Sequence, residues 1–247
     1  YMLFYEQRIV KQINNSLGLY FRYIDDIFIV INWPDRHLFK QIDRWNHFDD
    51  NIRLPTNIGS SVNFLDLYIE NKDGQLLTCV YQKPSYEPYY LPFSSIHPLH
   101  MKKNIPFTML LRAIRYCSTF EGYLNEREKL RTALILNKYP NCITNEQFNK
   151  VMLKFGINEL LSANNYSKER QKVMNAHIKE FIPPNYEQTI FIHFTYCSSM
   201  KNFPRKFHEL WIKYFGESPI NEIVPVLGTR NADNLQKRLI HTRSIDN

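Results

Sequence analysis

In the first 90 positions, segments with the apolar spacing of helices are followed by segments with the apolar spacing of strands. Two apolar runs flank Asp25 and Asp26, which predicts a β-hairpin with these two residues at its tip. Period-two alternation predicts a single strand from Val62 to Ile69, and Asp73-Gly74 predicts the turn into its partner strand. The predicted elements are a helix over residues 1–17 with Phe4, Val10, Ile13 and Leu17 as apolar points, strands over 19–24 and 27–31, a helix over 35–48, and strands over 62–69 and 75–82.

From residue 86 to residue 100 the sequence is rich in Tyr, Pro, Ser and His, and after it the spacing is mostly helical. Pro106 fits the first turn of a helix, Thr144–Gln147 has the pattern of a capping box, and Gly156 is expected to end its helix. The predicted helices cover 104–118, 125–138, 144–156, 167–181, 204–215 and 231–243, with a buried strand at 189–197 and a short strand at 223–227. This order predicts an α+β fold: antiparallel hairpins with helices over 1–92, a mainly helical domain over 93–183, and a small α/β extension over 184–247.

The composition is that of a folded chain, with 44% hydrophobic and 22% charged residues among 247. No apolar run reaches the roughly 18 residues that a membrane span needs, so no membrane partner is expected. The four cysteines contain no C-x-x-C pair and suit neither a disulfide framework nor a zinc site. Because the first residue is Tyr1, we expect that a segment upstream is missing.

Charge divides the chain into two unlike parts. Residues 1–90 carry 9 Lys and Arg against 11 Asp and Glu, whereas residues 91–247 carry 22 against 13. A basic second part indicates a polyanionic partner such as nucleic acid. A basic helical domain without such a partner is equally consistent with these charges.

The adjacent carboxylates Asp25 and Asp26 are unusual residues for a hairpin tip. Two-residue turns prefer Asn-Gly or Asp-Gly, and neighbouring like charges repel. Divalent metal, Mg²⁺ or Mn²⁺, would offset that repulsion, and paired aspartates hold the metal ions of two-metal phosphoryl transfer. The alternative is an ordinary solvated hairpin tip.

The sequence around this pair, Phe21-Arg22-Tyr23-Ile24-Asp25-Asp26-Ile27-Phe28-Ile29-Val30, resembles the Y-x-D-D catalytic hairpin of reverse transcriptases. An ordered series that follows it resembles one branch of these enzymes, the Penelope-like retroelements. The matching elements are Phe64-Leu65-Asp66-Leu67, Asp73-Gly74, Tyr81-Gln82-Lys83-Pro84, Ser95-Ile96-His97-Pro98, Leu111-Arg112-Ala113-Ile114-Arg115, and Asn234-Leu235-Gln236-Lys237-Arg238-Leu239-Ile240.

The resemblance implies the distal part of a polymerase palm over 1–92, followed by a helical thumb. In the complete RNA-directed DNA polymerase, Asp25 and Asp26 would be catalytic and would ligate Mg²⁺ or Mn²⁺, while Tyr23 would support the primer end. The third metal-binding aspartate, the fingers domain and the nucleotide-pocket segment have no counterpart in this sequence. We therefore expect the chain alone to be inactive. The alternative is that Asp66 replaces the missing aspartate as the third metal ligand. A GIY-YIG nuclease, which follows the thumb in many members, has no motif here, and the resemblance implies an intracellular, nuclear enzyme.

The basic residues of the predicted thumb are the candidates for contacts with the phosphates of an RNA–DNA or DNA duplex. The predicted nucleic-acid-binding residues are Lys83, Lys102, Lys103, Arg112 and Arg115. Arg112 and Arg115 are three apart and share a face, opposite a predicted core stripe of Phe107, Leu110, Leu111, Ile114 and Cys117. A solvated basic face is the alternative for each of them.

Two helices joined by Phe120-Glu121-Gly122 also suggest a helix-turn-helix, a shape that binds DNA. The alternative function is therefore a non-catalytic nucleic-acid-binding module of the helix-turn-helix type with a relic palm. A structural remnant with no activity is the third hypothesis.

Overall fold

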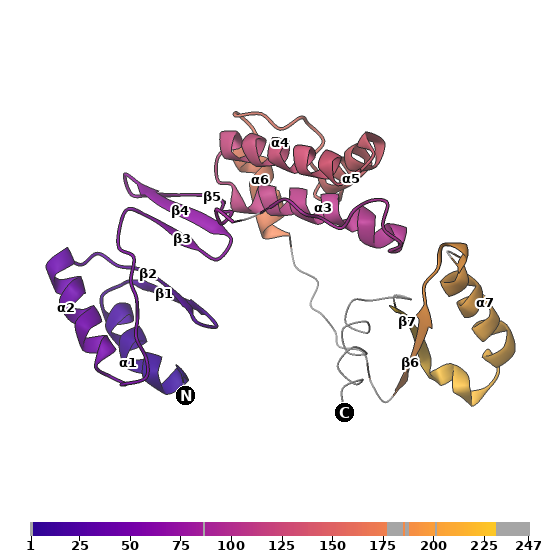
Figure 1. Ribbon diagram of the computed structural model, residues 1–247, viewed down its shortest axis with the longest axis horizontal. Coiled ribbons are helices and arrows are strands. Elements are labelled where there is room, and N and C mark those ends of the chain that lie inside the picture. The colour runs from indigo at the N-terminus through magenta and orange to yellow at the C-terminus, as the bar shows by residue number, and fades with distance from the viewer. Residues whose placement is uncertain (1, 86, 177–184, 186–187, 201, 231–247) are drawn as a thin grey trace, which may run out of the picture. The chain divides into compact units, whose positions relative to one another are not determined.

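A computed structural model describes residues 2–85, 87–176, 185, 188–200 and 202–230 (Figure 1). It confirms the predicted mixed α+β class, with small antiparallel sheets, a helical middle part and an α/β part near the C-terminus. The chain forms two compact units, one of residues 1–86 with 116–123 and the other of residues 87–115 with 124–247. The finer division into three domains stays a prediction. Within the described residues no helix has both the length and the apolarity to cross a bilayer.

The first unit begins with two helices that pack on a hairpin. Its elements are α1 (Met2–Asn15), β1 (Leu19–Tyr23), β2 (Asp26–Val30) and α2 (Asp35–Asn46). The buried apolar residues of α1 are Tyr5, Ile9 and Ile13, which are four apart and lie on one face. The predicted apolar points Phe4 and Leu17 are instead 76% and 96% exposed, so that part of the prediction is wrong.

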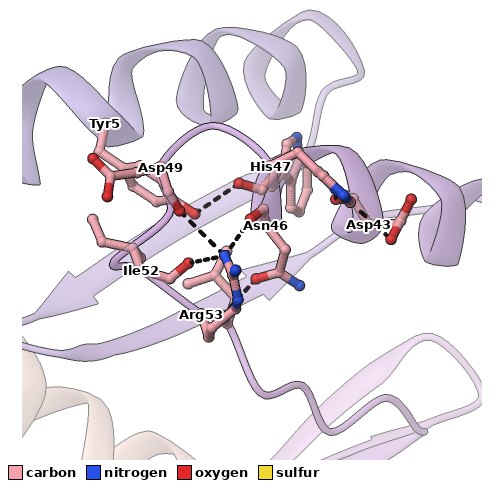
Figure 2. A network of polar contacts seen from close by, with 9 residues as sticks. Tyr5, Asp43, Asn46, His47, Asp49, Ile52 and Arg53 are labelled. Atoms are coloured by element: carbon pink, nitrogen blue, oxygen red, sulfur yellow. Dashed lines mark hydrogen bonds and ion pairs between the residues drawn. The ribbon is translucent and has the colours of Figure 1, made fainter.

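Polar contacts fix the loop that follows α2 (Figure 2). The Tyr5 hydroxyl donates to the Trp45 carbonyl at 3.0 Å, and burial raises the pKa of Tyr5. The Arg53 guanidinium donates to the carbonyls of Asn46 (2.8 Å) and Asp49 (3.3 Å), as Figure 2 shows. The bonds to Trp45 and Asn46 reach carbonyl groups in the last turn of α2, and the bond to Asp49 lies in the loop itself.

A three-stranded antiparallel sheet completes the first unit, with β3 (Ser61–Phe64), β4 (Leu67–Lys72) and β5 (Gln75–Val80). The single strand predicted over 62–69 is therefore wrong: Leu65 and Asp66 form a turn, and Asp66 is exposed there. The turn at Asp73-Gly74 is confirmed. Thr78 ties residues 116–118 to this sheet, because its hydroxyl donates to the Tyr116 carbonyl at 2.7 Å.

The second unit contains a bundle of four helices, drawn together in Figure 1. They are α3 (Leu99–Tyr116), α4 (Phe120–Leu136), α5 (Asn141–Lys154) and α6 (Tyr166–Asn175). Arg170 of α6 donates to the Ile114 (3.2 Å) and Arg115 (2.7 Å) carbonyls at the end of α3, and the Tyr166 hydroxyl also reaches Ile114. The predicted core residues Leu110, Ile114 and Cys117 are fully buried.

Three helix boundaries differ from the prediction. Pro106 lies inside α3 and is buried, because α3 begins at Leu99 rather than at residue 104. Phe120-Glu121-Gly122 is the first turn of α4 and not a connector, a role that residues 117–119 fill. Thr144 is buried inside α5, whose N-cap is Pro140 without a side-chain hydrogen bond, so no capping box forms.

The predicted end at Gly156 is confirmed. This glycine has φ 64°, its N–H donates to the Leu153 carbonyl, and the Ile157 N–H donates to the Met152 carbonyl. The pair of bonds is a Schellman motif. The same motif ends α4 with Lys138 at φ 65° and ends α1 with Leu17 at φ 56°.

The remaining described elements form a β-α-β arrangement. β6 (Thr189–Thr195) and β7 (Val224–Arg230) pair in parallel, and α7 (Phe203–Phe215) lies between them in sequence. The strand predicted as buried at 189–197 alternates between partly buried and exposed residues, because this sheet has two strands in the described residues. The end of the helix predicted over 167–181 and the helix predicted over 231–243 lie outside the described residues.

Candidate functional site

The carboxylate hairpin is shifted by one residue from its predicted geometry. Tyr23 pairs with Asp26, so the two turn residues are Ile24 and Asp25. Asp26 is the first residue of β2, and both aspartates are exposed. Ile24 has φ 51°, a conformation that β-branched residues rarely adopt. Backbone strain is therefore located beside the two carboxylates.

An arginine clamp holds this strained turn. The Arg22 guanidinium donates to both carboxylate oxygens of Glu6 on α1 and, at 2.9 Å, to the Ile24 carbonyl. The Tyr20 hydroxyl donates to the same Glu6 carboxylate at 3.0 Å. The hydrogen bond from Arg22 lowers the pKa of Glu6, whereas burial, followed by the bond to Glu6, raises the pKa of Tyr20. A helix–strand contact thus fixes the backbone of the hairpin tip.

Asp26 lies on the face of the hairpin opposite to the clamp. Side chains alternate along a strand, so Tyr20 and Arg22 face α1 while Phe21 and Tyr23 face the other way. Phe21 and Tyr23 are 52% and 58% exposed, and Phe21 stacks on Phe28 across the strands at 6.3 Å. The predicted site residues Tyr23 and Asp26 are therefore cross-strand neighbours on an open aromatic face.

The described residues do not assemble a complete metal site around this pair. Nowhere in the described ranges do three His, Cys, Asp or Glu side chains come together as possible metal ligands. Asp66, the alternative third ligand, lies in the exposed turn of the next hairpin. Two carboxylates without a third group do not make the three-carboxylate centre that the resemblance implies.

In the second unit, residues 87–95, called the strap below, are hydrogen-bonded to the turn between α4 and α5. The Asn137 side-chain amide donates to the Pro88 carbonyl at 2.8 Å, and the Asn137 carbonyl accepts from the Phe93 N–H at 3.0 Å. The Tyr139 hydroxyl donates to the Leu91 carbonyl at 2.9 Å. The strap therefore binds the four-residue turn 137–140 between α4 and α5.

Two of the predicted nucleic-acid-binding lysines serve this packing. The Lys102 ammonium donates to the carbonyls of Phe93 (2.8 Å) and Ser95 (2.9 Å) and lies over the Phe93 ring. Lys103 forms an ion pair with Glu146 of α5 at 3.1 Å. The ammonium group of Lys102 therefore binds the strap, and that of Lys103 binds α5.

The other three predicted cations differ in burial and in the unit to which they belong. Arg112 and Arg115 are partly buried on α3, and Arg112 acts electrostatically on Glu126, whose pKa is raised by burial. Lys83 is exposed and belongs to the first unit. The role of these five residues in nucleic-acid binding stays a prediction.

Sequence reasoning missed three exposed cations on α5 and in the turn before it. Lys138 lies in the turn before α5, and Lys150 and Lys154 lie on α5 itself, all three exposed. Lys150 also pairs with Glu146 at 2.7 Å. The signal that would have found them is the four-residue spacing of Lys150 and Lys154 on one helix.

Residues 89–149 match the animal helix-turn-helix domain family. The match covers the strap, α3, α4 and the first part of α5, about a quarter of the chain. No curated protein and no solved structure matches the chain. A domain of the helix-turn-helix type is therefore present over residues 89–149.

Proposed function

We propose that the chain is a nucleic-acid-binding protein that grips a duplex through α3, α4 and α5. The match of residues 89–149 to a helix-turn-helix family is the observation that carries this proposal. Residues 99–154 contain ten Lys and Arg and four Glu, a net charge of +6. Such an excess favours binding to phosphates, with counterion release as the driving force.

The test is duplex binding by the whole chain as salt is varied. We expect the logarithm of the binding constant for a labelled DNA duplex to fall linearly with the logarithm of KCl concentration between 50 and 200 mM, with a slope of about −0.9 for each phosphate contact. Exchanging Lys138 and Lys150 for Gln should weaken binding and reduce the slope by about 2. Lys40→Gln, an exposed lysine of α2, is the matched control. Absence of binding at low salt would contradict the proposal and favour a structural remnant.

The strained hairpin favours a second candidate. We propose that the first unit is the distal part of a reverse-transcriptase palm of the Penelope-like type, with Asp25 and Asp26 as its metal-ligating pair. The observation that supports it is the clamp from Glu6 and Arg22, which holds the costly Ile24 conformation next to the carboxylates. The duplex in the grip of the second unit would then be an RNA–DNA hybrid, and the location nuclear.

The dependence of primer–template binding on Mg²⁺ and on Asp25 distinguishes these two candidates, and primer extension tests whether the carboxylate pair is sufficient for catalysis. Because no third ligand joins Asp25 and Asp26 within the described residues, we expect the chain alone to bind a primer–template without extending it in Mg²⁺ or Mn²⁺. Extension by this chain that disappears in Asp25→Ala would show that the carboxylate pair is sufficient. Binding that is indifferent to Mg²⁺ and to Asp25→Ala would leave the helix-turn-helix module as the function.

A further inference from the structure

α5 has an exposed face opposite its buried side, and this face includes polar side chains. Its buried residues, Thr144, Gln147, Phe148 and Val151, lie on one side of the helix. On the other side Asn145 and Asn149, four residues apart, are exposed. The Asn149 side chain has no hydrogen-bond partner among the described residues. An exposed, unpaired carboxamide retains both a donor and an acceptor for a ligand.

The neighbouring helix holds one of these side chains in place. Arg131 of α4 donates to the Asn145 Oδ1 at 3.1 Å, and its guanidinium lies over the Phe148 ring. Because Oδ1 accepts from Arg131, the Asn145 NH₂ group is left as the outward donor. The assignment of oxygen and nitrogen in this amide follows from the hydrogen bond to Arg131.

We propose that α5 is the base-reading helix of a DNA-binding surface, with Asn149 bound to an adenine edge and Asn145 donating to a purine N7. This inference rests on the proposed function and adds the residues that read sequence. Asn is the side chain whose amide pairs bidentately with the N6 and N7 of adenine in the major groove. In helix-turn-helix proteins the second helix of the pair lies in that groove, and in the pair α4–α5, joined by the turn 137–140, that helix is α5.

The dimensions of the helix agree with such a reading. Four residues of α-helix rise about 6 Å, close to two base-pair steps of about 3.4 Å, for a helix that follows the groove. Asn145 and Asn149 would therefore read bases about two steps apart.

Charge on the same helix favours DNA as the occupant. Lys150 and Lys154 accompany the two asparagines on α5, and Lys138 precedes the helix. Glu146, the one carboxylate of α5, is already paired with Lys103 and Lys150. The occupant is B-form DNA, because the major groove of A-form duplexes is too narrow for side chains to read.

The test is a selection of random-sequence B-form duplexes by the whole chain, followed by affinity measurements on the selected duplex. We expect enrichment of adenine at one position, and a loss of about tenfold in affinity when that adenine is exchanged for guanine or for 7-deaza-adenine. In Asn149→Ala this penalty should disappear while the salt dependence remains. Arg131→Lys should weaken the preference at the second position, since an ammonium does not hold the amide of Asn145 as a guanidinium does.

Asn125→Ala, an exposed asparagine on α4, is the matched control and should keep the full preference. Thermal unfolding checks that each variant is folded. Duplex binding without sequence preference, or a preference that Asn149→Ala retains, overturns this inference and leaves the proposed function intact. Absence of any duplex binding overturns the proposed function and the inference with it.

Discussion

The hairpins of the first unit are closed by two-residue turns of unlike chemistry. In β4–β5 the turn is Asp73-Gly74, with φ values of 51° and 83°, the residues that such a turn prefers. In β1–β2 the turn is Ile24-Asp25, with a β-branched residue at φ 51°. The β3–β4 turn repeats the unfavourable choice, with Leu65 at φ 53° before Asp66. The hairpin that carries the paired carboxylates is thus one of those whose turn is strained.

The comparison extends to what holds each turn. The Asp73-Gly74 turn is held by a local bond, in which the Gly74 N–H donates to the Asn71 side chain. The Ile24 carbonyl instead accepts from Arg22, which is itself bound to Glu6 on α1. A strained conformation persists only when its surroundings over-determine it. The clamp from Arg22 and Glu6 is therefore the contact that holds the strained Ile24 conformation in place.

Removing the acid of the clamp should have the largest effect. In Glu6→Ala, Arg22 and Tyr20 lose their shared acceptor in a partly buried site, so stability should fall by more than for either turn substitution below. Thermal unfolding measures the loss. Asp50→Ala, an exposed acid of the same unit, is the control and should leave unfolding unchanged. An equal midpoint for both variants would show that the clamp does not stabilise the hairpin.

The clamp should also make the first unit sensitive to acid. The hydrogen bond from Arg22 holds the pKa of Glu6 below its ordinary value of 4.5. The ion pair therefore stabilises the fold above pH 4.5, and this contribution is lost as the pH falls through the lower folded-state pKa. The unfolding midpoint of Glu6→Gln should consequently depend less on pH below 4.5 than that of the natural chain.

Glu146 should maintain part of the acid sensitivity of unfolding in the Glu6→Gln variant. Hydrogen bonds from Lys150 and Lys103 also lower the pKa of Glu146, in the second unit. Glu146→Gln should remove a separate share of the acid sensitivity, with the same sign. Identical pH profiles for Glu6→Gln and the natural chain would contradict the assignment to the clamp.

The sequence predicted well those features that local chemistry determines. Gly156 ends α5 and Asp73-Gly74 closes a hairpin, because in both places a residue suited to positive φ appears where the conformation needs it. Leu17 and Lys138 adopt the same left-handed conformation at the ends of α1 and α4. Neither residue type signals it, so these left-handed caps could not be predicted from propensity.

The candidate site was predictable only in part, for a related reason. Tyr23, Asp25 and Asp26 stand out by residue type, and the structure places them together on one hairpin. Two predictions were wrong: the turn at Asp25-Asp26 and the continuous strand through Asp66. The alternation of apolar and polar residues looks the same with or without a tight turn, so it could not locate either turn. Glu6 has no sequence signal, since its partner Arg22 is sixteen residues away and belongs to another element.

Gly74→Ala tests the favourable turn. At φ 83° a Cβ is strained by about 1 kcal/mol, and no atom lies within 4 Å of its position, so the loss reports backbone strain alone. Gly156→Ala should lose a similar amount in the second unit, for the same reason. Gly59→Ala, with an ordinary φ and ordinary contacts, should be neutral or slightly stabilising. Chemical denaturation of the three variants checks this order.

The smallest and most informative effect is expected at the unfavourable turn. At an ordinary position alanine is more stable than glycine by about 0.5–1 kcal/mol, whereas at positive φ the preference reverses. Ile24 is 65% exposed, so removing its side chain loses little buried area. Ile24→Gly should therefore be more stable than Ile24→Ala, and equal to or about 0.5 kcal/mol more stable than the natural chain. Such a gain would mean that the chain retains a destabilising residue beside Asp25, which is expected where a fixed backbone serves binding or catalysis rather than stability. If Ile24→Ala is the more stable of the two, the turn is unstrained, and the clamp from Glu6 and Arg22 is an ordinary packing contact.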